Sequence, residues 1–295
     1  MVAIKRQRPD PMPVVRPVYD AEASPALRAI YSEMIAALQV PWVAMITRGY
    51  ARYPTFFATL WAGMREVCAS EAYVRGAEML MSTVDADAAV LPSTPVVQNM
   101  RKLGYTHDDL ANIRNVVDVL SHGNNIYQPL VMAALVLLEG GELSGDSSIP
   151  PAFRGRHAPE QRAPFIFVEA HHAAAETRAL YDEIARTLGL PYINTDYRVL
   201  ARWPSFLPIA WEALKPNIGA PAWLDLVEAY FQRSVAVAQA LPNPGGLTSA
   251  VLRQAAEKDA PLGEVLAVAR LLNNNIPPLL VNMAFLRHQL YAEGR

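Results

Sequence analysis

The sequence repeats itself at a fixed offset of 150 residues, and this repeat is the strongest constraint on what the chain can fold into. The repeated residues are Tyr31, Glu33, Pro41, Arg48, Ala51, Arg52, Pro54, Phe56 and Trp61, which recur as Tyr181, Glu183, Pro191, Arg198, Ala201, Arg202, Pro204, Phe206 and Trp211, and Asn124, Asn125, Ile126 and Val131, which recur as Asn274, Asn275, Ile276 and Val281. Copies of about 130 residues are too long for a solenoid, whose units run from about 20 to 50 residues. We therefore expect a fused dimer with a groove between its halves, which is a common place for a ligand site.

The clearest break in the repeat lies inside its best-matched stretch. Three apolar residues of the first copy, Ala44, Met45 and Ile46, become the polar residues Asn194, Thr195 and Asp196 in the second. Packing demands the same residues from both copies, whereas a catalytic group is needed only once. We interpret this break as a candidate site.

Composition separates four parts of the sequence. Residues 1–17 are rich in proline, which cannot continue a helix, and we expect an extended N-terminal arm there. The two copies occupy residues 18–140 and 168–295. Residues 141–167 are rich in Gly, Ser and Pro, which is typical of a linker.

Both copies show the apolar periodicity of helices. It predicts helices over residues 26–38 and 176–188, with Ser24 as the N-cap of the first and Gly189 as the C-cap of the second. Further helices are predicted at residues 107–120, 128–138, 262–272 and 278–290, and helix starts at Pro54 and Pro204. Alternating strand patterns with hairpin turns are absent. We predict an all-α fold of two tandem helical repeats, with five or six helices each, that form a pseudo-dimer with the active site between them.

The composition excludes several classes of protein. With 52% hydrophobic and 18% charged residues, the sequence is typical of a globular protein with a large core. A net charge of -2 argues against nucleic acid as a partner, because phosphate binding needs a basic face. Apolar runs such as residues 130–138 are too short to span a bilayer, and no secretory signal opens the sequence. We expect a cytoplasmic homodimer without a membrane partner.

Metal and cofactor sites are not expected either. Cys68 is the only cysteine, which excludes an internal disulfide and a multi-cysteine zinc site, and its apolar surroundings predict a buried thiol. The neighbours His171 and His172 would not face one another on a helix, so they are poor candidates to share a metal. HExxH, GxGxxG, GxSxG and P-loop patterns are also missing.

Asp196 and Asn124 are the main candidates for chemistry, and each has a structural alternative. Asp196 follows a short apolar stretch, where a carboxylate shielded from water can act as a base, but Asp is also a common helix cap. Asn124 lies in the run 121–125, which resembles a helix terminus, yet its amide can also hold a water molecule. We interpret its neighbour His122 as a capping residue.

Three aromatic or apolar residues near these positions are expected in the core. They are Trp42, Met45 and Tyr192. The indole N–H of Trp42 can also hold a halide or a carbonyl beside apolar walls.

Three short motifs follow one another along nearly the whole sequence. They are Val40-Pro41-Trp42-Val43-Ala44, Gly123-Asn124 with Tyr127, and Asp196-Tyr197 leading to Ala201-Arg202-Trp203-Pro204. In order and spacing these motifs resemble the group I 2-haloacid dehalogenases, which are the D-specific and DL enzymes. This family is unrelated to the L-specific dehalogenases of the HAD type.

The resemblance implies roles for the candidate residues. It implies that Asp196 activates a water molecule held by Asn124 and that Trp42 lines the substrate pocket. Met45 stands where the family has phenylalanine, which keeps an apolar wall, and Thr195 stands where it has serine, which keeps a hydroxyl.

Two further positions bear on selectivity and substrate binding. Asn194 matches the asparagine of D-selective members, where non-selective members have alanine, so the resemblance implies D selectivity. We add Tyr192 to the predicted substrate-binding residues. The D-type pair of Thr and Glu four residues apart has no match, because residues 61–81 offer only Ser70, Glu71 and Glu78 at other spacings.

The predicted function is the hydrolysis of short-chain 2-haloalkanoic acids to 2-hydroxyacids with inversion, without a cofactor. D selectivity is the first choice and a DL enzyme the second. One alternative makes Asp196 a nucleophile that forms an ester intermediate. Another, from a different class, is a non-catalytic helical protein that binds small carboxylates.

Overall fold

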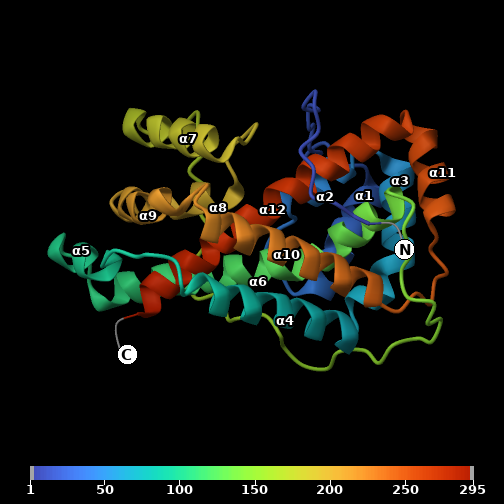
Figure 1. Cartoon of the computed structure of the whole chain (residues 1–295), viewed down its shortest axis with the longest axis horizontal. Coiled ribbons are helices and arrows are strands. Elements are labelled where there is room, and N and C mark those ends of the chain that lie inside the picture. The colour runs from blue at the N-terminus through green and yellow to red at the C-terminus, as the bar shows by residue number, and fades with distance from the viewer. Residues whose placement is uncertain (1–2, 293–295) are drawn as a thin grey trace. The chain divides into compact units, whose positions relative to one another are not determined.

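The computed structural model describes residues 3–292, and helices account for all of its regular structure apart from one isolated β-bridge (Figure 1). Over these residues there are twelve α-helices, one short 3-10 helix and no β-strand. The prediction of an all-α fold is confirmed. In the same range, no helix combines the length and the apolar character needed to cross a membrane.

The twelve helices follow in sequence order. The first six are α1 (Pro25–Leu38), α2 (Met45–Tyr50), α3 (Pro54–Cys68), α4 (Glu71–Ala88), α5 (Val96–Lys102) and α6 (His107–Leu138). The last six are α7 (Ala175–Leu188), α8 (Thr195–Leu200), α9 (Phe206–Leu214), α10 (Pro221–Ala240), α11 (Ser249–Asp259) and α12 (Leu262–Tyr291), with the 3-10 helix η1 (Lys215–Asn217) after α9. Both predicted caps are confirmed, because Ser24 accepts a hydrogen bond from the Leu27 amide at 3.2 Å and Gly189 ends α7 with a φ of 64°.

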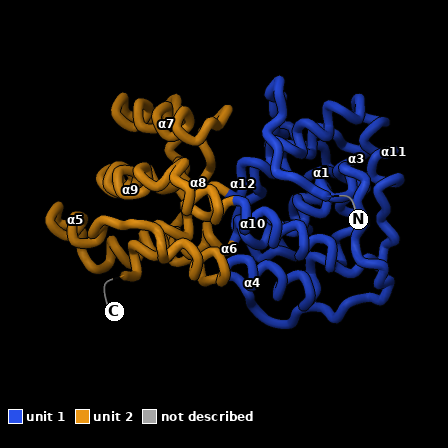
Figure 2. Tube along the Cα trace, viewed as in Figure 1, with its two compact units in different colours: residues 1–81, 123–158, 228–277 blue, residues 82–122, 159–227, 278–295 orange. Residues whose placement is uncertain are grey.

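The protein consists of two compact units (Figure 2). Unit 1 comprises residues 1–81, 123–158 and 228–277, and unit 2 comprises residues 82–122, 159–227 and 278–295. Helices α4, α6, α10 and α12 therefore contribute residues to both units. Each unit takes residues from both predicted copies, so the copies and the compact units divide the sequence differently.

Hydrogen bonds recur in the two units at the offset of the sequence repeat. The Trp61 indole N–H donates to the Glu33 carboxylate at 2.7 Å in unit 1, and the Trp211 indole N–H donates to Glu183 at 3.0 Å in unit 2. Helices α1 and α7 begin at residues 25 and 175, and α2 and α8 begin at residues 45 and 195. These bonds and helix starts follow the offset of 150 residues noted in the sequence.

Unit 1 is built around α3, which packs against α1 and α11. The predicted start of α3 at Pro54 is confirmed, and its buried residues are Phe56, Phe57, Leu60, Trp61, Met64, Val67 and Cys68. Burial raises the pKa of the Cys68 thiol to about 12, so this cysteine is an inert part of the core, as predicted. At the start of α3 the Phe56 amide donates to the carboxylate of Asp259 at 2.8 Å, and the helix dipole favours a negative charge there.

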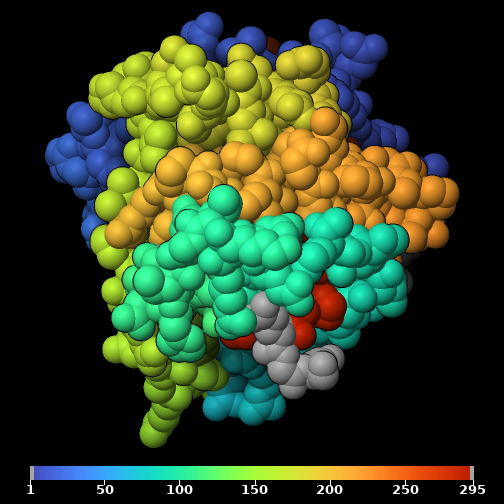
Figure 3. Space-filling view, turned by 90° about the vertical axis from the view of Figure 1, so that its left-hand side faces the viewer, coloured from blue at the N-terminus to red at the C-terminus, as the bar shows by residue number. Residues whose placement is uncertain are grey.

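In unit 2, α9 packs against α5, α8 and η1. Figure 3 looks onto this unit, where the surfaces of α7 (yellow), α9 (orange) and α5 (green) follow one another. The predicted helix start at Pro204 is wrong, because α9 begins at Phe206. A helix starting at Pro204 would need an N–H from residue 208 for one of its first rungs, and Pro208 has none.

Helix α6 runs without interruption from His107 to Leu138, and α12 runs through Pro277 and Pro278. The sequence had predicted two helices in each of these stretches, and that division is wrong. Proline in a helix interior removes one backbone hydrogen bond, but tertiary contacts can supply a substitute.

In α6 the substitute is the hydroxyl of Tyr73, which comes from α4. This hydroxyl donates to the carbonyl of Ile126 at 2.6 Å and accepts from the amide of Leu130 at 3.1 Å. It therefore bridges the helix rung next to Pro129, where the regular ladder is opened. Burial raises the pKa of Tyr73 well above its usual value, so the hydroxyl keeps the proton that it donates.

Replacing Tyr73 by phenylalanine removes this bridge and leaves two backbone groups of α6 buried without it. We expect Tyr73→Phe to lower the free energy of unfolding by about 1–3 kcal/mol in a urea titration. The matched control is Tyr19→Phe, since the Tyr19 ring is 45% exposed and should tolerate the loss of its hydroxyl. Equal stability of the two variants would contradict the bridging role.

Candidate functional site

Trp42 is held against the backbone of α6 in unit 1. The Tyr127 hydroxyl, one turn beyond Gly123 on α6, donates to the Trp42 carbonyl at 2.8 Å. A Cβ atom added at Gly123 would lie 2.6 Å from Cζ2 of the indole and closer still to Cη2. Glycine at this position therefore lets the indole lie directly on the helix, beside the next residue, Asn124.

Asn124 is a half-buried residue in the interior of α6, and it does not end a helix. The helix-terminus interpretation of residues 121–125 is thus wrong, and so is the capping role for His122, because both assumed a break that α6 does not have. The neighbouring Asn125 is anchored by the hydroxyl of Tyr230, which donates to its Oδ1 at 2.9 Å. This turn of α6 is held in place while the Asn124 side chain keeps partial access to solvent.

Asp196 lies in the first turn of α8, in unit 2, and it is buried at 2% exposure. The helix begins at Thr195 and its N-cap is Asn194, so the alternative that Asp196 caps this helix is wrong. The positive end of a helix dipole favours the ionised form of a carboxylate in the first turn. A buried carboxylate that does not serve as the cap is a strong candidate for a base.

Helix α8 has only six residues and is fixed by the residues that follow Asp196. Asn282 of α12 donates to the Tyr197 hydroxyl at 3.1 Å and accepts from the indole N–H of Trp223 at 2.9 Å. Arg198 donates to both carboxylate oxygens of Glu169 at 2.8 Å each. These buried and partly buried bonds determine where α8 presents its first turn.

The tyrosines nearest to these residues are not alternative bases. Burial raises the pKa of Tyr127 and of Tyr197 far above the usual range, so both hydroxyls stay protonated. They act as fixed hydrogen-bonding groups in unit 1 and unit 2, respectively. Asp196 carries a carboxylate, which is a group that can act as a general base.

The predicted site residues fall into two clusters, one in each unit. Unit 1 holds Trp42, Asn124 and Met45, which is the first residue of α2 and is half-buried. Unit 2 holds Tyr192, Asn194, Thr195 and Asp196 on α8 and the segment before it. Within unit 2, Arg198 donates to the Thr195 hydroxyl at 3.3 Å, whereas the Oδ1 atom of Asn194 is buried and has no hydrogen-bond partner among the described residues.

Local structure explains two of the three residues that the resemblance left without a role. Ser70 is fully buried and accepts a hydrogen bond from the Tyr73 amide at 3.3 Å, at the start of α4. Glu71 pairs with Arg75 at 3.0 Å on the surface of the same helix. Neither observation indicates a catalytic role.

Sequence reasoning missed several residues that shape the two clusters. Tyr73, Asn282 and Trp223 support the helices that carry the site, and Gln128 is a fully buried amide one turn after Asn124. The sequence did contain a signal for Gln128, because its counterpart at the offset of 150 residues is Pro278 and the repeat is therefore broken there. The other three become visible only when helices distant in the sequence are packed together.

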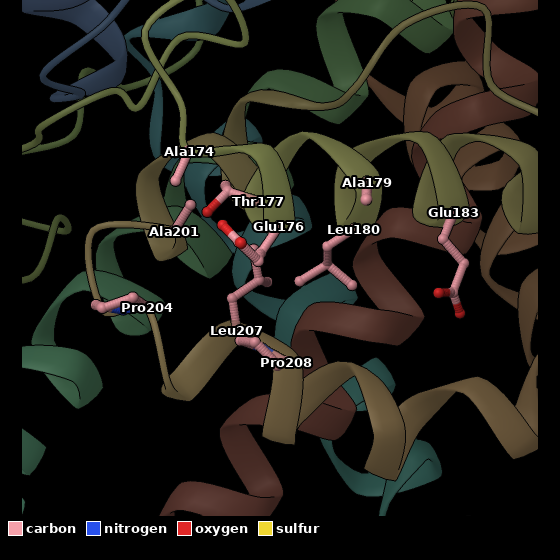
Figure 4. A pocket seen from close by; sticks show the side chains of 10 residues that line it. All are labelled: Ala174, Glu176, Thr177, Ala179, Leu180, Glu183, Ala201, Pro204, Leu207 and Pro208. Carbon is pink, nitrogen blue, oxygen red and sulfur yellow. The ribbon is translucent and has the colours of Figure 1, made fainter.

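A cavity of about 530 Å³ lies between α7 and α9 in unit 2 (Figure 4). Thr177 and Leu180 of α7 point toward Leu207 and Pro208 of α9. Its walls contain none of the predicted site residues. The cavity therefore lies apart from the candidate chemistry.

The fold matches that of a solved dehalogenase. A structure described as the complex of D-2-haloacid dehalogenase with L-LA superposes with a TM-score of 0.85 and 28% identity, covering 97% of this protein and 100% of that one. The class that fold and site define is therefore the all-α 2-haloacid dehalogenases.

Curated relatives agree with the structural match. The protein is 34% identical over 253 residues to (R)-2-haloacid dehalogenase from Rhizobium sp. (strain NHG3), a match that covers 84% of this sequence and 96% of that one. It is 30% identical over 294 residues to (R)-2-haloacid dehalogenase from Pseudomonas putida, a match that covers 97% of each. No family model matches the sequence. This chain belongs to the (R)-2-haloacid dehalogenase family, which confirms the resemblance found in the sequence.

The close packing of Trp42 on α6 can be tested at Gly123. Gly→Ala in a helix normally stabilises by up to about 1 kcal/mol, but Gly123→Ala forces the indole away and should cost about 1–3 kcal/mol of unfolding free energy. The near-UV circular dichroism of the tryptophans should change as well. Gly263→Ala in α12 is the control, because nothing lies within 4 Å of its added Cβ. A Gly123→Ala variant as stable as Gly263→Ala would contradict the packing.

Proposed function

We propose that this protein hydrolyses the carbon–halogen bond of short D-2-haloalkanoic acids and releases L-2-hydroxyacids and halide. Its family membership over nearly the whole sequence supports the class of reaction. The observation that carries the mechanism is the burial of the Asp196 carboxylate in the first turn of α8, where it does not serve as the cap.

In the proposed reaction Asp196 removes a proton from a water molecule held by the amide of Asn124. The water oxygen attacks C2 on the face opposite the halogen, the carbon–halogen bond breaks, and the halide leaves with its electron pair. Attack from the opposite face inverts C2, so a D substrate gives an L product. Asp196 then returns its proton to solvent, and the proposed reaction uses no cofactor.

Trp42 and Met45 have a supporting role in this proposal. The indole on the α6 backbone and the half-buried Met45 side chain supply apolar walls for the alkyl group and the halogen. A general base contributes a factor of about 10² to 10⁴ to the rate, so orientation and desolvation supply the remainder.

Asn194 is the proposed selectivity residue. Its amide group makes no capping hydrogen bond to α8, and its Oδ1 atom is buried without a hydrogen-bond partner among the described residues. The bulk and polarity of this amide fit a role in excluding one enantiomer.

The oligomeric state and the compartment stay predictions of the sequence. We infer a homodimer from exposed apolar residues on helices, such as Leu224 and Val251, which are 43% and 46% exposed. We infer a cytoplasmic location from cysteine usage, since the one cysteine of the sequence, Cys68, is a buried free thiol.

The base is tested by Asp196→Asn, which keeps the shape of the side chain and removes its basicity. We expect kcat for halide release from D-2-chloropropionate to fall by about 10² to 10⁴-fold. Asp182→Asn, an exposed position on α7, is the control and should keep wild-type activity. Undiminished halide release by Asp196→Asn would contradict the assignment.

The same reaction in ¹⁸O-labelled water separates direct attack from the ester route. In a single turnover, direct attack puts the label in the product and leaves the carboxylate of Asp196 unlabelled. An ester intermediate instead transfers an unlabelled oxygen from Asp196 to the product and leaves the label in the enzyme.

Selectivity is tested by Asn194→Ala. We expect turnover of the L enantiomer to rise relative to the D enantiomer, because the smaller side chain admits both. Asn112→Ala, on the exposed face of α6, should leave the ratio of kcat/KM for the two enantiomers unchanged. An unchanged ratio in Asn194→Ala would remove the role given to this residue.

A further inference from the structure

Gln128 is a fully buried residue whose side-chain polar atoms are both unpaired. It is 0% exposed, and within residues 3–292 neither its Oε1 nor its Nε2 atom has a hydrogen-bond partner. Leaving both ends of an amide unpaired in the core is costly, and nearly all buried polar groups bind protein atoms or ordered water. The structure therefore calls for a small hydrogen-bonding molecule at this position.

The position of Gln128 on α6 points to its partner. Asn124 and Gln128 are four residues apart, a spacing that puts two side chains on one face of a helix as neighbours. Asn125, on the same turn as Asn124, is already engaged with the Tyr230 hydroxyl at 2.9 Å. The spacing places the half-buried Asn124 amide next to the unpaired Gln128 amide on α6.

The backbone around Gln128 is fixed on both sides. The Tyr73 hydroxyl binds the carbonyl of Ile126 and the amide of Leu130, and Pro129 follows Gln128 directly. These bonds fix the backbone from which the Gln128 side chain extends. Such fixed placement is what a site for an ordered molecule requires.

The sequence repeat is also broken at this residue. Asn124 has Asn274 as its counterpart in the second copy, but the counterpart of Gln128 is Pro278. The pair of amides on one face is therefore present only in the first copy.

We propose that Gln128 and Asn124 together bind the water molecule that the reaction consumes. An amide suits water on both sides, since its oxygen accepts a water proton and its N–H donates to the water oxygen. The two amides together supply two of the about three hydrogen bonds that a buried water typically makes. This inference rests on the proposed function and adds a second residue to its water site.

The test is Gln128→Met, which keeps the length of the side chain and removes its polar atoms. We expect kcat for D-2-chloropropionate to fall about tenfold, the effect of one lost hydrogen bond between neutral groups, with KM unchanged. The thermal unfolding midpoint should be unchanged or higher, because no amide remains buried. Gln289→Met is the matched control, as Gln289 is another buried glutamine whose Nε2 has no described partner. Its kcat should equal that of the wild type.

The double variant Asn124→Ala with Gln128→Met tests whether the two residues share one water. If they do, the double variant is no slower than Asn124→Ala alone, whereas multiplied effects would overturn the shared site. Wild-type kcat in Gln128→Met would overturn the role of Gln128, and a raised KM with unchanged kcat would assign it to substrate binding instead.

A high-resolution crystal structure of the wild type gives a readout that does not depend on activity. We expect one ordered water within hydrogen-bonding distance of both amides, and its absence would overturn the inference. Wild-type protein that releases no halide would instead refute the proposed function, while the crystal structure would still decide whether the two amides bind water.

Discussion

The packing of the Trp42 indole on the backbone of α6 is the contact on which the unit 1 part of the site depends. It requires a glycine at position 123, because any larger residue would occupy the space of the ring. It also requires α6 to continue past this glycine, since Tyr127 on the next turn holds the Trp42 carbonyl. The Tyr73 hydroxyl maintains that continuity at Pro129. Asn124 and Gln128 owe their fixed positions to the same turn.

The unit 2 cluster of predicted site residues, on α8 and the segment before it, is positioned in a different way. A six-residue helix such as α8 has little stability of its own, so its position comes from side chains beyond its first turn. Tyr197 and Arg198 make those contacts, while Asn194 and Asp196 lie at the N-terminal end of the helix. Tyr197 and Arg198 thus position α8, whereas Asn194 and Asp196 have the proposed roles in the reaction. The polar break in the repeat, residues 194–196, contains the residues with the proposed roles.

The sequence was sufficient for the all-α class, for the caps of α1 and α7 and for the location of the polar break at residues 194–196. It failed where a local signal was outweighed by a distant contact. The run 121–125 predicted a helix end and residues 128–138 a separate helix, but the ring of Trp42 and the hydroxyl of Tyr73 come from other parts of the sequence. Asn124 shows a related limit, because the repeat retains it as Asn274, so a search for broken symmetry alone would have passed over it.

The most direct test of the account is to incubate the wild-type protein with each enantiomer of 2-chloropropionate and to measure chloride release and the configuration of the product. We expect chloride release from the D enantiomer, with L-lactate as the product, and little release from the L enantiomer. Formation of D-lactate from the D substrate would contradict the single inverting attack. Absence of chloride release from both enantiomers would contradict the proposed activity itself.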